Sequence, residues 1–198
     1  MYKLLVLDLD GTLTNSKKEI PEHNLNTLLR AQEKGLRIVL ASGRPTYGIT
    51  PLAEQLQLER FGGYILSFNG GQIIDCQTNK VIYETVLDPA HYDYLYEQGN
   101  TDDFKIISYE DNYIVGEDIE NEYIKYEALL NKMPLKKVEN FRKHFNCPLP
   151  KCLVVGEPTK LAELEKKMHE KLKDVMSVYR SEPFFLELLP LGIDKAKS

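Results

Sequence analysis

The chain has 198 residues, of which 42% are hydrophobic and 28% are charged, and its formal net charge is −5. This composition is typical of an ordinary globular chain with one large domain or two small ones, and it argues against disorder. The acidic balance provides no basic surface for nucleic acid, and the apolar runs are far too short to span a membrane. No signal-peptide pattern precedes the first apolar run. We therefore expect a cytoplasmic protein that binds neither nucleic acid nor membranes.

The three cysteines are an odd number and contain no Cys-x-x-Cys pair. They predict neither a disulfide framework nor a redox motif, and we expect buried thiols. His144, Cys147 and Cys152 are close enough in sequence for a zinc site to be considered. No fourth ligand is in register, however, and prolines interrupt the segment, so zinc is disfavoured.

The first predicted element is a strand in which an apolar run ends in Asp8 and Asp10, before Gly11. Alternate side chains of an extended strand share a face, so both carboxylates should point to one side. Adjacent carboxylates repel unless one is protonated or a cation lies between them. The alternatives are a plain polar turn and a calcium loop, but a calcium loop requires glycine where this chain has Leu13. We favour a site for chemistry at this strand end.

The next segments predict a unit of parallel strands and crossover helices, because helical and extended patterns alternate along the chain. The predicted elements are a helix over 24–34, a strand over 37–41, a helix over 45–58, a strand over 64–68 and a β-hairpin with strands over 72–75 and 81–86. The carboxyl ends of parallel strands meet at one edge of a sheet, so Ser42 should lie close to Asp8. Asn69-Gly70 follows the third strand, where it forms either a simple turn or part of the site.

From about residue 88 onwards, tyrosines become frequent and the predicted elements become shorter and more polar. The pattern suggests one sheet with helices on one face. The predicted elements are helices over 89–98, 121–131 and 159–172, a weaker helical stretch near Val138, and strands over 105–109, 113–115, 151–155, 175–180 and 184–188. Basic residues do not interleave with the tyrosines in the way that single-strand binders require, so we interpret the tyrosines as core and rim residues rather than as a base-stacking platform.

Three stretches resemble the ordered motifs of the haloacid dehalogenase superfamily. They are Asp8-Leu9-Asp10-Gly11-Thr12-Leu13, Leu40-Ala41-Ser42-Gly43-Arg44-Pro45 and Gly192-Ile193-Asp194-Lys195. About 150 residues separate the second motif from the third, as in the Cof-type phosphatase branch, which has a large cap inserted there. The resemblance implies an α/β fold with a Rossmann-like parallel sheet core, incomplete at the C-terminus, and an inserted α+β cap domain. It implies a core over 1–86, a cap over 87–189 and a return to the core over 190–198.

The resemblance also implies the reaction. Asp8 would be the nucleophile that forms an aspartyl-phosphate, and Asp10 would be the general acid and base. Mg²⁺ would be held by the Asp8 carboxylate, the Asp10 main-chain carbonyl and acids of a fourth motif. Ser42 and Lys195 would bind the phosphoryl group.

Four further residues border the substrate by the same resemblance: Gly43, Arg44, Asn69 and Gly70. Arg44 would steer a phosphorylated substrate or, equally, form a structural pair with a nearby acid. The expected function is a magnesium-dependent phosphatase of small phosphorylated metabolites, with sugar phosphates as candidates, acting as a monomer or a weak homodimer. The alternatives are a non-catalytic phosphate-binding or ligand-binding module and a phosphomutase of the same fold. A dehalogenase is disfavoured, since displacing halide from carbon needs no proton donor at Asp10.

The fourth motif of the superfamily, an acidic Gly-Asp-x-x-x-Asp loop, has no counterpart after Lys195. Without its acids the metal would keep two protein ligands, and the first strand would be left at a bare sheet edge. We therefore suspect a fragment of a longer enzyme, and inactivity of this form is kept as an alternative to the phosphatase activity given above.

Overall fold

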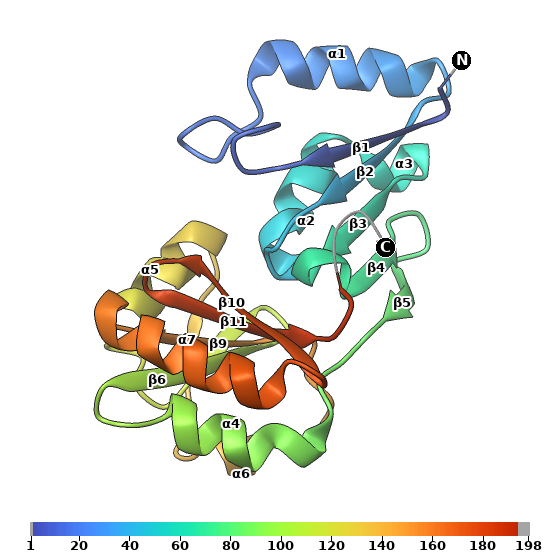
Figure 1. The fold of residues 1–198 in the computed structure, drawn as a ribbon. Helices are drawn as coiled ribbons and strands as arrows, with labels where there is room; N and C mark the ends of the chain where they lie inside the picture. Colours follow the sequence, from blue (N-terminus) through green and yellow to red (C-terminus); the bar gives the residue numbers. More distant parts are fainter. Residues whose placement is uncertain (1, 194–198) are drawn as a thin grey trace. The chain divides into compact units, whose positions relative to one another are not determined.

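The computed structural model describes residues 2–193. The chain divides into two compact units, each with its own sheet (Figure 1). The first unit holds the described residues up to Glu84, and the second holds Thr85–Ile193.

The first unit contains a five-stranded sheet in the order β1-β2-β3-β4-β5. Its strands are β1 Leu4–Asp8, β2 Arg37–Ala41, β3 Tyr64–Ser67, β4 Gln72–Asp75 and β5 Lys80–Glu84. The first three strands are parallel, and β4 and β5 form an antiparallel hairpin beside them. The mixed α/β fold expected from the sequence is therefore confirmed, and the first three strands of the sheet are parallel.

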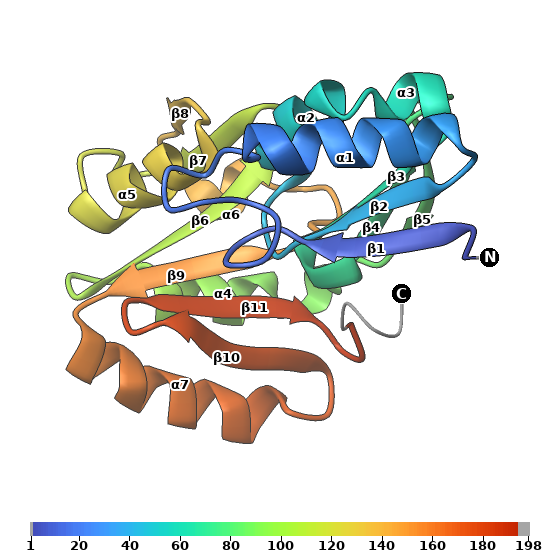
Figure 2. The same cartoon turned by 90° about the horizontal axis from the view of Figure 1, so that it is seen from above.

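Helices α1 Glu22–Glu33, α2 Thr46–Gln55 and α3 Leu58–Phe61 lie on one face of this sheet (Figure 2). Leu25 of α1 and Leu52 of α2 pack in the same cluster as Ile38 and Leu40 of β2. The helices are thus fixed by a shared apolar core, as amphipathic helices on a sheet must be.

The prediction of one continuous helix over 45–58 was wrong. The chain breaks at Gln57, which has a left-handed backbone with φ of 53°. Leu56 and Leu58 on either side are both fully buried, with 0% exposure. Because the helix breaks at Gln57, both leucine side chains can enter the core. The helical spacing of the apolar residues does not reveal this break.

The second unit contains a six-stranded sheet in the order β10-β11-β9-β6-β7-β8. Its strands are β6 Phe104–Glu110, β7 Tyr113–Gly116, β8 Leu135–Lys137, β9 Cys152–Gly156, β10 Met176–Glu182 and β11 Phe185–Pro190. Its helices are the 3₁₀ turn η2 Pro89–His91, α4 Tyr92–Gly99, α5 Glu122–Asn131, α6 Phe141–His144 and α7 Pro158–Leu172. All neighbouring strands are antiparallel except β7 and β8.

Helices cover both faces of this second sheet, so the expectation of helices on one face was wrong. A Cβ added to Gly99 of α4 would meet Ile106 of β6, whereas one added to Gly116 of β7 would lie close to both Ile107 of β6 and Ile124 of α5. Successive residues of a strand point to opposite faces. Because Ile106 faces α4 and Ile107 faces α5, the two helices lie on opposite sides of the sheet.

The sequence did not predict β8, and it placed a helix near Val138 where the structure has α6 at Phe141–His144. A strand of three residues with a single apolar side chain, Leu135, has too little alternation to be recognised. The α6 turn is capped by the Asn140 side chain, which accepts a hydrogen bond from the Lys143 backbone N–H at 2.8 Å.

The cysteines differ in burial. Cys152 is buried, Cys76 is half-buried and Cys147 is exposed. The expectation of buried thiols is therefore wrong for Cys147, which lies in the loop before Pro148, where packing does not require an apolar residue.

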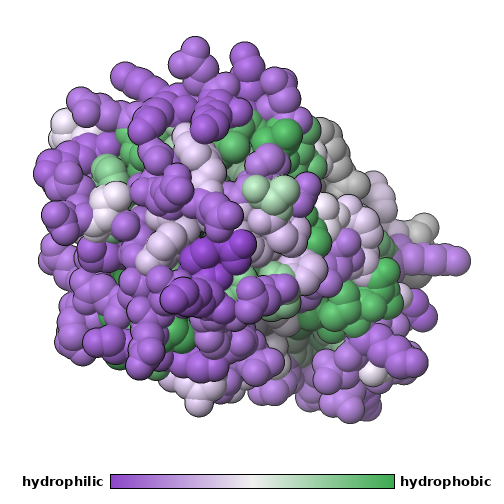
Figure 3. Space-filling view, turned by 90° about the horizontal axis from the view of Figure 1, so that it is seen from below, coloured by the Kyte–Doolittle hydropathy of each residue, from purple (hydrophilic) through white to green (hydrophobic). Residues whose placement is uncertain are grey.

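Hydrophilic residues cover most of the surface in the view of Figure 3. Among the described residues, every helix is too short or too polar to cross a membrane.

Candidate active site

The carboxyl ends of β1 and β2 lie side by side, because Asp8 pairs in register with Ala41. Ser42 follows Ala41 directly, and its backbone N–H donates to the Leu66 carbonyl of β3 at 2.9 Å. The strand order therefore brings Asp8 and the start of the Ser42 loop to one edge of the first sheet. This is the juxtaposition predicted from the parallel pattern.

The loop after β1 departs from the sequence prediction. The strand ends at Asp8, and Asp10 lies in the turn that follows rather than in a continued strand. Leu9 is fully buried, and its carbonyl accepts from the backbone N–H of Thr14 and from the Thr14 hydroxyl, each at 2.9 Å. Gly11 has φ of 81°, which glycine adopts without the steric cost of a side chain. The chain thus turns sharply around the Leu9 carbonyl.

The Asp8 carboxylate lies at the end of β1 and is half-buried. The Thr12 hydroxyl donates to its Oδ2 atom at 3.1 Å. Thr12 belongs to the Asp-x-Asp-Gly-Thr run but was not among the predicted site residues. Its contact with Asp8 becomes apparent only when the turn is formed.

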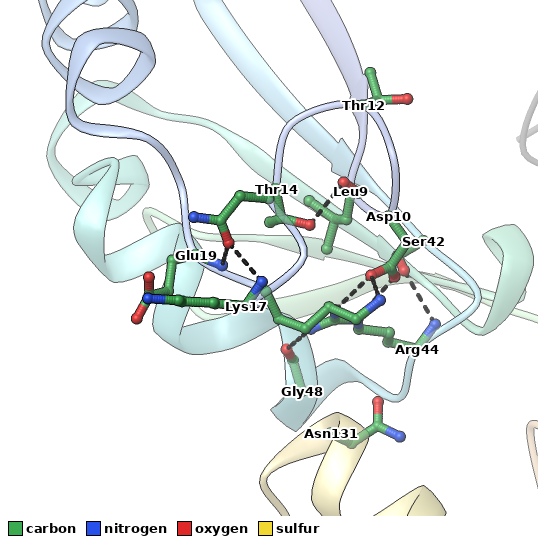
Figure 4. Close-up of polar contacts among 12 residues, drawn as sticks. Leu9, Asp10, Thr12, Thr14, Lys17, Glu19, Ser42, Arg44, Gly48 and Asn131 are labelled. Atoms are coloured by element: carbon green, nitrogen blue, oxygen red, sulfur yellow. Dashed lines mark hydrogen bonds and ion pairs between the residues drawn. The ribbon is translucent and has the colours of Figure 1, made fainter.

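Asp10 is bound by two cations from different parts of the first unit, and Figure 4 labels one of them, Arg44. Arg44 donates through Nε to Oδ2 at 3.0 Å and through Nη2 to Oδ1 at 2.7 Å, and Lys18 donates through Nζ to Oδ1 at 2.7 Å. Such a two-pronged arginine contact fixes the plane of a carboxylate. Arg44 was expected either to steer a phosphorylated substrate or to form a structural pair with a nearby acid. In this structure it forms the pair, with Asp10.

These contacts set the ionisation of Asp10. Burial acts to raise the pKa of its carboxyl, but hydrogen bonds and charge from Arg44 and Lys18 outweigh burial and lower the pKa below its usual value. Asp10 is therefore an anion at neutral pH in this structure. Lys18 was not predicted as a site residue, because a lysine in a polar loop resembles any solvated lysine.

Hydrogen bonds hold the loop that contains Ser42 against the turn that follows β3. The Ser42 hydroxyl accepts from the Arg44 backbone N–H at 3.2 Å, and the Ser42 carbonyl accepts from the Asn69 backbone N–H at 3.0 Å. A Cβ on Gly43 would come within 2.8 Å of Asn69 Oδ1, so a larger residue at this position would have to displace the Asn69 side chain. Gly70 is buried in the same turn. Five of the predicted residues thus meet in one pair of loops.

The first motif offers oxygen atoms that could bind a cation. Nowhere in residues 2–193 do three or more His, Cys, Asp or Glu side chains gather as a metal cluster. The Asp8 carboxylate and the Asp10 main-chain carbonyl are oxygen donors of the kind that Mg²⁺ prefers. The donor type therefore fits Mg²⁺, with two protein ligands. Asp194 and Lys195 of the third motif lie outside the described residues.

Comparisons with known proteins agree with the motifs. A family model for haloacid dehalogenase-like hydrolases matches residues 5–198. The "Putative phosphatase YxeH" of Bacillus subtilis is 30% identical over 195 residues, covering 96% of this chain and 70% of that protein. A crystal structure of a haloacid dehalogenase-like hydrolase from Bacteroides thetaiotaomicron is 50% identical with a TM-score of 0.96, covering 100% of this chain and 74% of that one. A sugar phosphatase of subclass IIB has the same fold, with a TM-score of 0.75 at 24% identity, covering 98% of this chain and 72% of that one.

Proposed function

Because the chain belongs to the haloacid dehalogenase-like hydrolase family, we propose that it is a phosphatase of small phosphorylated metabolites and that Asp8 accepts the phosphoryl group. The observation that carries this proposal is the edge at which Asp8, Ser42 and the Asp10–Arg44 pair meet. Relatives named as phosphatases, one of them a sugar phosphatase, support phosphate monoesters, including sugar phosphates, as the substrate class.

In the first step, a carboxylate oxygen of Asp8 attacks phosphorus and the bond from phosphorus to the leaving oxygen breaks. Thr12 orients the Asp8 carboxylate by donating a hydrogen bond to its Oδ2 atom. The Ser42 hydroxyl, at the adjacent strand end, donates to a phosphoryl oxygen. When bound, Mg²⁺ would be held by the Asp8 carboxylate and the Asp10 carbonyl, and it would neutralise charge on the transferring group.

Asp10 needs both of its ionisation states for this reaction. The leaving oxygen takes a proton from the Asp10 carboxyl, and the resulting carboxylate then takes a proton from the water that attacks the phosphorylated Asp8. The first step requires protonated Asp10, whereas Arg44 and Lys18 favour the anion. We assign to Arg44 a second position, on the phosphoryl group of a bound substrate. Its departure from Asp10 would raise the pKa of that carboxyl when a proton is needed.

The proposal is tested by phosphate release from an aryl phosphate and from a panel of sugar phosphates in the presence of Mg²⁺. We expect release by the wild type and none by Asp8→Asn. Asp174→Asn, which changes an exposed aspartate of the second unit, is the matched control and should behave as the wild type. Phosphate binding without release in the wild type would instead support the non-catalytic binding module.

A further inference from the structure

Four side chains of the first unit form a continuous chain of hydrogen bonds beside the loop that contains Ser42. Three of them, Ser67, Gln72 and Glu84, lie opposite one another across the neighbouring strands β3, β4 and β5. Side chains directly opposite on adjacent strands share a face of the sheet. The fourth, Thr46, is the first residue of α2. The strand register therefore brings three polar side chains to the start of the helix that follows the loop.

The chemistry of the groups fixes the direction of this chain. A carboxylate only accepts hydrogen bonds, so the Gln72 amide turns its Nε2 atom toward Glu84 and donates to Oε1 at 2.7 Å. The Gln72 Oε1 atom therefore points the other way and accepts from the Thr46 hydroxyl at 2.6 Å. Because Thr46 has one hydroxyl proton, the Ser67 hydroxyl is the donor in its 2.7 Å contact with Thr46 Oγ1. Every donor thus points toward the Glu84 carboxylate.

Burial and charge make these hydrogen bonds strong. Ser67 is fully buried, with 0% exposure, whereas Thr46 and Gln72 are half-buried and Glu84 is exposed. A buried hydroxyl that loses its partner costs the full desolvation of that group. Hydrogen bonds in a chain polarise one another, and a bond to a charged acceptor is stronger than one to a neutral acceptor. The Thr46 side chain is therefore held from two sides.

Backbone contacts pass this constraint to the loop. The backbone N–H of Phe68, the residue after Ser67, donates to the Arg44 carbonyl at 3.0 Å. Thr46 follows Arg44 by two residues, so its contact with Ser67 adds a side-chain bond to the pairing of the loop with the end of β3. The Arg44 guanidinium, on the same short segment, binds Asp10.

We propose that Thr46 is a positioning residue, whose hydroxyl fixes the backbone from which Arg44 reaches Asp10. As a contribution to catalysis this inference rests on the proposed function, in which Ser42 and Arg44 bind the phosphoryl group. Its effect on the Arg44–Asp10 pair does not, because that pair is formed in the structure without a substrate.

The first test is carbon-13 NMR titration of the Asp10 carboxyl in the full chain. Thr46→Val keeps the branched shape but removes the hydroxyl, so we expect the loop to shift, the Arg44 contact to weaken and the pKa of Asp10 to rise. Thr46→Ser keeps the hydroxyl and should titrate as the wild type. Thr50→Val is the matched control in α2, because the Thr50 hydroxyl donates instead to the Thr46 backbone carbonyl at 3.1 Å.

Exchanging the amide and the carboxyl tests the direction of the chain. Gln72→Glu places two carboxylates side by side and should raise the pKa of Asp10 as Thr46→Val does, whereas Glu84→Gln keeps an acceptor for Gln72 and should leave it unchanged. In Q72E/E84Q the carboxylate at position 72 accepts from Thr46 and from the amide at position 84, so the wild-type titration should return. The uncharged Thr46→Val variant separates this effect from that of an added charge.

Kinetics with an aryl phosphate provides a second readout. Thr46→Val should lower kcat/KM by about tenfold and Thr46→Ser by less than about threefold, because small displacements of binding groups slow catalysis strongly. The titration needs no turnover. A wild type that releases no phosphate would therefore contradict the proposed function, and the titration would still decide the role of Thr46.

Circular dichroism verifies that each variant is folded, and Gln72→Glu with its double variant carries the test if Thr46→Val does not fold. A folded Thr46→Val protein in which Asp10 titrates as in the wild type would overturn the proposal, even if the protein were less stable. A Q72E/E84Q protein that titrates like Gln72→Glu would overturn it as well.

Discussion

At the scale of single residues, the proposed reaction depends on Asp10 changing its ionisation state. The carboxylate is held by a two-pronged contact from Arg44 and a single contact from Lys18. The Arg44 side chain is only 11% exposed, so solvent competes little for its guanidinium group. In the proposed reaction the Asp10 carboxylate can therefore accept a proton, and to donate one it must first be released by Arg44.

Removing the guanidinium should raise the pKa of Asp10. In Arg44→Gln the anion loses its largest source of stabilisation, burial continues to disfavour the charged form, and the carboxyl therefore titrates at higher pH. Carbon-13 NMR titration of the aspartate carboxyls measures this directly. Lys18→Gln should give a smaller rise and Lys17→Gln none, since the Lys17 side chain does not bond to Asp10 in the described structure. An unchanged Asp10 pKa in Arg44→Gln would show that the pair does not control the proton.

Replacing Asp10 should slow the turnover of a substrate with a poor leaving group more than that of a substrate with a good one. Asp10→Asn keeps the shape of the side chain but cannot donate or accept the reaction proton, so turnover of a sugar phosphate should fall by about 10²- to 10⁴-fold. The fall should be smaller for p-nitrophenyl phosphate, because its leaving oxygen needs no proton to depart. Steady-state kcat measurements on both substrates test this. Equal losses on the two substrates would argue that Asp10 positions groups rather than transferring protons.

At the scale of elements, two loops at adjacent strand ends fix the site. Gly43 and Asn69 approach so closely that a Cβ on Gly43 would lie 2.8 Å from Asn69 Oδ1. The sequence predicted the strands that lead into these loops, because apolar runs and turn residues are local signals. It could not predict that Asn69 would have φ of 60° or that Lys18 would reach Asp10, since both depend on contacts between distant segments.

Gly43→Ala should cost up to about 1 kcal/mol of folding stability, because the new methyl group displaces the Asn69 side chain. Asn69→Ala removes the obstructing oxygen, so the same glycine substitution in that background should cost less. Urea unfolding of the four proteins in this double-mutant cycle measures the coupling. If Gly43→Ala lowers the free energy of unfolding equally in both backgrounds, the added methyl group does not clash with the Asn69 side chain.

The sheet of the second unit contains a buried ion pair, in which Lys151 Nζ lies 2.7 Å from Glu187 Oε2. Lys151→Met would leave Glu187 buried without its cation and should cost about 3–5 kcal/mol. The double variant Lys151→Met/Glu187→Leu removes both charges and should recover most of that loss. Thermal unfolding followed by circular dichroism compares them. A double variant as unstable as the single one would show that packing of the lysine chain, rather than charge, is what matters.

At the scale of the whole molecule, each unit has its own sheet and its own buried apolar cluster. Motif order predicted the family, and strand periodicity predicted the mixed α/β fold. The second unit was predicted less well, because helices on both faces of its sheet and the short strand β8 follow from packing that no local pattern encodes. The domain limits expected at residues 86 and 189 and the role of Lys195 stay predictions.

The central claim is that Asp8 accepts the phosphoryl group, and acid quenching during turnover followed by peptide mass spectrometry tests it most directly. We predict one added phosphoryl group on the peptide that contains Asp8, lost in Asp8→Asn and accumulating in Asp10→Asn with p-nitrophenyl phosphate, where hydrolysis lacks its base. Phosphate release with no modified peptide at any quench time, or with the group on another residue, would contradict the claim.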